Sequence, residues 1–156
     1  MTILECHDYY DNRVRHALSY LPKDIFDKHV DSLAIIGMGH RDAVRLTPVT
    51  RKHEVIVLSD RILPRRKATE DSPEVRYFNY AVLHEVAHAV CKHRPPNELT
   101  KEEADAQEAE ADGLAMKWFN NHVAARNIAA LVPMTKEELD GHEARSKRLM
   151  EEAYQR

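Results

Sequence analysis

The sequence predicts a single α+β domain over residues 1–156, with a small sheet of about three strands packed on long helices. Two observations lead to this fold class. Short runs rich in β-branched residues lie before residue 60, and strong helix-start signals follow them. No stretch rich in Gly, Pro or Ser divides the chain, and 43% of its residues are hydrophobic, which is enough for one core.

The first part of the chain predicts one helix and the strands. Apolar residues recur at helical spacing from residue 8 to about residue 20, and Pro22 ends that pattern. Pro48 should place the second strand, or at least its end, at an edge of the sheet. The three predicted strands are Leu33–Met38, Ala43–Val49 and Glu54–Ser59.

Three helix-start signals follow. Ser72 offers a capping hydroxyl and Pro73 suits the first helical position, so a helix should run from there to about His93. Thr100-Lys-Glu-Glu103 is a capping box that should open a second helix, which we expect to end near Asn120. Thr135-Lys-Glu-Glu138 repeats the signal and predicts a charged C-terminal helix.

Composition excludes several classes of function. A net charge of −3 and a pI near 6.4, with scattered basic residues, give no electrostatic basis for binding nucleic acid. Cys6 and Cys91 are too few for a disulfide framework, and no leader segment is recognisable, so we expect a cytoplasmic protein. The longest apolar runs, Leu33–Met38 and Ile128–Met134, are too short to cross a bilayer, so we expect no membrane insertion.

The most informative motif is His84-Glu85-Val86-Ala87-His88, an HExxH sequence in the first of the predicted long helices. Residues four apart lie on one helix face about 6 Å apart along the axis, so His84 and His88 can bind one ion. Glu85 could then act on the water at that ion as a general base. The alternative is a polar helix face with two ordinary histidines, which the motif Glu108-Ala109-Glu110-Ala111-Asp112 makes less attractive.

A catalytic zinc site usually has three protein ligands and one position for water. Helical geometry disfavours His93, which should face away from His84, and Cys91, which lies about 10 Å from it along the axis. Glu110 should point to solvent. Glu108 remains as the third ligand, with Asp112 one turn later as the carboxylate that orients a ligating histidine. These acids could instead form a solvated acidic face.

Together, His84–His88 and Glu108-Ala109-Glu110-Ala111-Asp112 resemble the HExxH and ExxxD motifs of the gluzincin metallopeptidases. The likeness covers about residues 53–119 and is strongest to peptidases of the HtpX and CAAX-protease type and to the ImmA/IrrE regulatory peptidases. It implies a zincin-like fold with one zinc ion. The HtpX-like enzymes are membrane-embedded, however, and this sequence shows no spanning segment.

The resemblance also raises questions about substrate binding. Glu54–Ser59 occupies the place of the zincin edge strand that pairs with extended substrate, although a plain core strand is an equal alternative. Larger gluzincins have a C-terminal subdomain that stabilises the oxyanion, and fewer than forty residues follow the second motif helix here. The substitutes with suitable side chains are His122, Arg126, His142 and Tyr154, and no spacing selects among them.

The favoured function is zinc-dependent hydrolysis of a peptide or protein substrate, with Glu85 as the general base. The second hypothesis is an ImmA/IrrE-like regulatory protein that acts on one intracellular partner with little general proteolysis. A purely structural zinc site ranks last, because such sites prefer four ligands rich in cysteine. Manganese, cobalt or nickel could use the same ligands.

Overall fold

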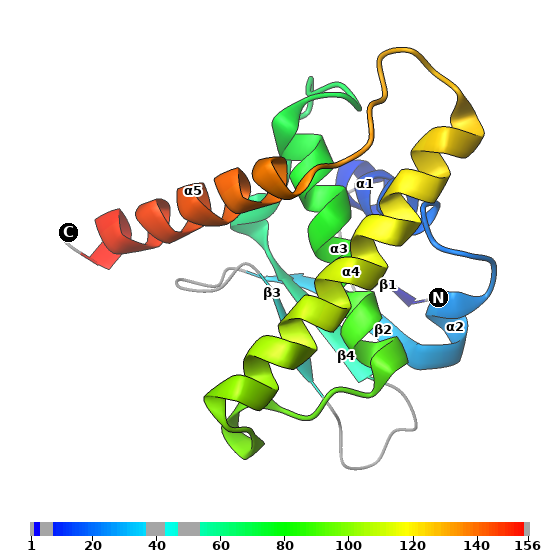
Figure 1. The fold of residues 1–156 in the computed structure, drawn as a ribbon. Coiled ribbons are helices and arrows are strands. Elements are labelled where there is room, and N and C mark those ends of the chain that lie inside the picture. Colours follow the sequence, from blue (N-terminus) through cyan, green and yellow to red (C-terminus); the bar gives the residue numbers. More distant parts are fainter. Residues whose placement is uncertain (1, 4–7, 37–42, 47–53, 155–156) are drawn as a thin grey trace.

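The structure is a computed structural model that describes residues 2–3, 8–36, 43–46 and 54–154 (Figure 1). It confirms the α+β fold class, with a four-stranded sheet followed by long helices. The strands are β1 (Thr2–Ile3), β2 (Val30–Ile36), β3 (Ala43–Leu46) and β4 (Glu54–Ser59). The helices are α1 (Asp8–Leu18), α2 (Ile25–His29), α3 (Pro73–Cys91), α4 (Lys101–Arg126) and α5 (Lys136–Tyr154), with short 3₁₀ turns η1 (Asp60–Ile62) and η2 (Pro96–Glu98).

The sheet has the order β1-β2-β4-β3. β2 is parallel to both β1 and β4, whereas β3 is antiparallel to β4. β3 therefore lies at an edge, as expected, although Pro48 itself is outside the described residues. The suggestion that Glu54–Ser59 is an edge strand was wrong, because β4 pairs with β2 on one side and β3 on the other. Most of its side chains are buried, which is the pattern of a core strand.

The three predicted strands are present, and the third, Glu54–Ser59, has the predicted bounds. β2 begins at Val30, three residues earlier than predicted, and Gly37 and Met38 lie outside the described residues. The end of the second predicted strand, residues 47–49, also lies outside them. α2 and β1 were missed, since five and two residues are too few to give a clear periodic pattern.

α3 lies at the centre of the fold, in contact with α1, α4, β3 and β4 (Figure 1). Phe78, Leu83 and Val86 are fully buried on it. Its start is the predicted cap, because the Ser72 hydroxyl accepts a hydrogen bond from the Val75 amide at 3.4 Å. The beginning of the helix that carries the HExxH motif was therefore predicted correctly from its capping residues.

α4 packs along α3 through a stripe of small residues. Ala111 and Ala115 are fully buried, and their small side chains allow the two helix backbones to come close. The predicted capping box is present: the Thr100 hydroxyl accepts from the Glu103 amide at 3.2 Å, and the Glu103 carboxylate accepts from the Thr100 amide at 2.9 Å. The expected end near Asn120 was wrong, because α4 continues to Arg126 and ends where Asn127 turns left-handed.

α5 is joined to α3 by a buried ion pair. Arg76 is 5% exposed and donates two hydrogen bonds to the Glu138 carboxylate, at 2.6 and 2.7 Å. It also donates to the carbonyls of Val132 and Pro133, at 2.8 and 3.3 Å. These bonds hold the start of α5 near the start of α3, and the remainder of α5 extends away from the body of the fold (Figure 1).

Candidate metal centre

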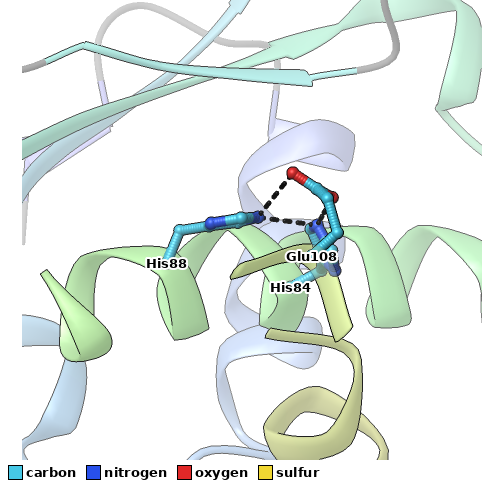
Figure 2. Close-up of side chains that lie close together, drawn as sticks. All are labelled: His84, His88 and Glu108. Atoms are coloured by element: carbon cyan, nitrogen blue, oxygen red, sulfur yellow. Dashed lines mark hydrogen bonds and ion pairs between the residues drawn. The ribbon is translucent and has the colours of Figure 1, made fainter. Parts of the chain in front are cut away.

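His84 and His88 lie one turn apart on α3 and point to the same place (Figure 2). Their Nε2 atoms are 2.9 Å apart. His88 is 9% exposed and the His84 side chain 16% exposed, so both rings are held within the fold with one edge open. This is the arrangement that helical spacing of the HExxH motif predicts.

Glu108 reaches both rings from α4 (Figure 2). Its Oε2 lies 3.2 Å from His84 Nε2 and its Oε1 lies 3.6 Å from His88 Nε2. One ligand atom from each residue falls within 4.8 Å of the others. Two imidazoles and a carboxylate suit Zn²⁺, so the donor set fits that ion and leaves a fourth tetrahedral position open.

The other nitrogen of His84 is held by α4. Its Nδ1 lies 2.9 Å from Asp112 Oδ1, one helical turn beyond Glu108. The Tyr80 hydroxyl donates a hydrogen bond to the same Asp112 oxygen and lies 3.3 Å from His84 Nδ1. A proton on His84 Nδ1 directed at Asp112 leaves the Nε2 lone pair for an ion, which is the arrangement typical of ligating histidines.

The other nitrogen of His88 is held by His93, which was predicted to lie on the opposite face of the helix. His93 Nδ1 lies 2.7 Å from His88 Nδ1, and His93 Nε2 lies 3.0 Å from Glu110 Oε2. A continuous helix would carry His93 to the opposite face, but α3 ends at Cys91 and Lys92 is left-handed, with φ 56° and ψ 42°. This reversal turns His93 back against His88, and its amide donates to the His88 carbonyl at 3.1 Å.

The position of His93 could not be predicted because the residue that turns the chain is Lys92. A left-handed residue at the end of a helix is usually glycine, sometimes asparagine, and here it is a lysine. Pro95 and Pro96 mark the end of the helix only approximately. Glu110 was expected to point to solvent. Its side chain is 65% exposed, but the same turn brings His93 into contact with its carboxylate.

The carboxylates set the electrostatics of the centre. Burial would lower the pKa of His84, but hydrogen bonds to Asp112 and Glu108 and the charge of Glu85 outweigh it and raise the pKa to about 10. Hydrogen bonds from His84 and His88 hold the pKa of Glu108 well below its ordinary range. Burial and the bond to Asp112 raise the pKa of Tyr80, so this hydroxyl keeps its proton. Glu108 therefore stays ionised, as a carboxylate ligand to a cation must be.

Glu85 follows His84 on α3 and is partly buried. Its carboxylate is close enough to contribute to the raised pKa of His84. It is not among the three residues whose ligand atoms converge. This position beside the centre is compatible with a base that acts near an ion without binding it.

The residues considered for oxyanion stabilisation have other contacts. His122 stacks on Tyr20 with ring centroids 3.8 Å apart, and His142 stacks on Tyr77 at 4.9 Å. Arg126 pairs with Glu70 at 2.7 Å. The side chain of Tyr154 lies outside the described part of the chain.

Among the described residues, no helix combines the length and the apolar character that a membrane span needs. Searches among curated proteins and among solved structures found no match. Comparison with protein families matched residues 75–148 to the Peptidase U49 family. The matched span contains the HExxH motif, Glu108 and Asp112, so it covers the whole candidate centre. This match supports a peptidase function, with a peptide or protein as the substrate.

Proposed function

We propose that the chain is a zinc-dependent peptidase of the gluzincin type, in which His84, His88 and Glu108 hold the ion. The observation that carries this proposal is the convergence of two Nε2 atoms from α3 and one carboxylate from α4 within 4.8 Å. When bound there, zinc would supply a Lewis acid that makes water acidic enough to act as a nucleophile near neutral pH.

Glu85 is the general base of this proposal. Its carboxylate takes a proton from the attacking water and then passes it to the nitrogen of the leaving amine, so one residue serves both halves of the hydrolysis. Asp112 and His93 each hold the Nδ1 side of a ligand histidine. These contacts keep both Nε2 lone pairs directed at the same point.

The edge of the sheet supports a peptide as substrate. β3 ends the strand order, and α3, which carries the centre, contacts it. An extended peptide can add to such an edge through main-chain hydrogen bonds, which tolerate many side chains. We therefore assign substrate pairing to β3 instead of β4.

The test compares wild type with Glu85→Gln, Glu108→Ala and a matched control, Glu102→Gln, an exposed glutamate on α4. Metal content is measured on each purified protein, and turnover is measured on a mixed peptide library. Glu85→Gln should keep its zinc and lose about 10²–10⁴-fold in turnover, whereas Glu108→Ala should lose the zinc itself. Turnover by zinc-loaded Glu85→Gln at the wild-type rate would show that Glu85 is not the general base. Unchanged zinc content in Glu108→Ala would show that Glu108 is not the third ligand.

A narrower form of the proposal, a peptidase that acts on one protein partner, is favoured by α5. Beyond its anchor at Glu138 this helix extends away from the fold with exposed charged residues (Figure 1). A whole-cell protein extract is treated with wild type or Glu85→Gln, and the new N-termini are sequenced. Cleavage of one or a few proteins favours the partner-specific peptidase, and cleavage of many supports a general one.

A further inference from the structure

A second group of metal-binding side chains lies beside the proposed centre. Cys91 ends α3, His93 follows the left-handed Lys92, and Glu110 faces them from α4. One ligand atom of each of these three residues lies within 4.8 Å of the others. Cys91 is partly buried, His93 is 8% exposed and the Glu110 side chain is 65% exposed, so the group is anchored in the fold and open to solvent.

The chemistry of this group is that of a zinc-type site. A thiolate, an imidazole and a carboxylate are all ligands of Zn²⁺, and three of them leave one tetrahedral position for water. Hard cations such as Mg²⁺ and Ca²⁺ prefer sites made only of oxygen, so the sulfur and nitrogen donors favour a borderline or soft divalent ion. On binding, the Cys91 thiol would lose its proton to solvent and form the metal–sulfur bond.

The two groups are linked through one hydrogen bond. A neutral imidazole has one N–H and one lone pair, so the 2.7 Å contact between His88 Nδ1 and His93 Nδ1 holds a single proton. If His88 binds an ion through Nε2, its proton is on Nδ1 and is donated to His93. His93 then carries its own proton on Nε2, directed at Glu110 3.0 Å away, and has no lone pair there for a second ion.

An ion at the second group requires the opposite placement of the protons. An ion held by His93 Nε2 places the His93 proton on Nδ1, where it is donated to His88. His88 must then carry its proton on Nε2, the atom that faces His84 and Glu108. With both ions bound, two N–H groups would point at each other across 2.7 Å, which the present arrangement of the rings does not allow.

We propose that Cys91, His93 and Glu110 form a second site for a zinc-type cation, and that its occupancy weakens metal binding at His84, His88 and Glu108. The regulatory part of this proposal rests on the proposed function, since the site whose metal binding is weakened is the proposed catalytic one. The existence of the second site does not, because it depends only on the three side chains.

Cobalt(II) separates the two sites, because only a thiolate ligand gives a sulfur-to-cobalt charge-transfer band in the near ultraviolet. Cobalt is titrated into full-length wild type, Cys91→Ser, the matched control Cys6→Ser, and Glu108→Ala. In wild type and Cys6→Ser, the band should grow only after the first equivalent has bound, and it should be absent in Cys91→Ser. Glu108→Ala removes the competing ion. In this variant the midpoint of the band should therefore fall at a cobalt concentration at least about tenfold lower than in wild type.

Each result has a definite meaning. A titration with no band that depends on Cys91, in wild type and in Glu108→Ala, would overturn the second site. Equal midpoints for the band in wild type and Glu108→Ala would overturn the coupling. Failure of the proposed function looks different, since a protein without any peptidase activity would still show the band.

Discussion

Asp112 on α4 accepts a hydrogen bond from His84 on α3, with 2.9 Å between Oδ1 and Nδ1. This bond joins the two helices that carry the candidate centre. It also orients the His84 ring, because the nitrogen that faces Asp112 cannot face the ion. The carboxylate thus acts on metal binding through the histidine, without being a ligand itself.

Asp112→Asn should weaken zinc binding about 10–100-fold, since an amide does not hold the proton on His84 Nδ1 as a carboxylate does. Affinity is measured by competition with a chromophoric chelator. Asp105→Asn, which changes an exposed acid on the same helix, serves as the control. Equal affinity in Asp112→Asn and wild type would show that Asp112 does not orient the ring.

His93→Leu should also lower zinc affinity about 10–100-fold, because His88 loses the group that holds its Nδ1. A leucine fills the buried space with an apolar side chain, so thermal unfolding without metal is measured as well. Reduced affinity with a preserved melting temperature supports a positioning role. A fall in melting temperature alone, with unchanged affinity, would assign His93 to packing.

Arg76→Met should destabilise the fold by about 3 kcal/mol, because Glu138 and two carbonyls lose a buried charged donor. Urea unfolding measures this free energy. Arg94→Met is the matched control: its partner Glu103 is at the surface, and such pairs contribute about 0–1 kcal/mol. Similar losses in both variants would mean that burial does not strengthen the Arg76 pair.

The same ion pair predicts a pH dependence of stability. Hydrogen bonds from Arg76 lower the pKa of Glu138 from its ordinary value of 4.5. A group with a lowered pKa in the folded state stabilises the fold above its ordinary pKa, and this contribution is lost as the pH falls through the folded value. The difference in unfolding free energy between wild type and Glu138→Gln should therefore be full near neutral pH and shrink below pH 4.5. A difference that stays constant down to pH 2 would contradict the shift.

Helical periodicity was sufficient to predict much of the candidate centre. Residues four apart share a helix face whatever the rest of the fold does, so the pairs His84 with His88 and Glu108 with Asp112 followed from spacing. Helix starts at Ser72 and Thr100 were equally local, because each cap is made by residues within one turn. The meeting of the two pairs rested on the family resemblance and on the alanine stripe of α4.

Features that depend on contacts between distant segments could not be predicted from local sequence patterns. The order of strands placed β4 inside the sheet and β3 at its edge, and short strands carry no local signal of their neighbours. The contact of His93 with His88 required one residue, Lys92, to adopt a left-handed conformation that its side chain disfavours. Packing of the surrounding helices compensates for such a local cost, and its result is visible only when the whole chain is folded.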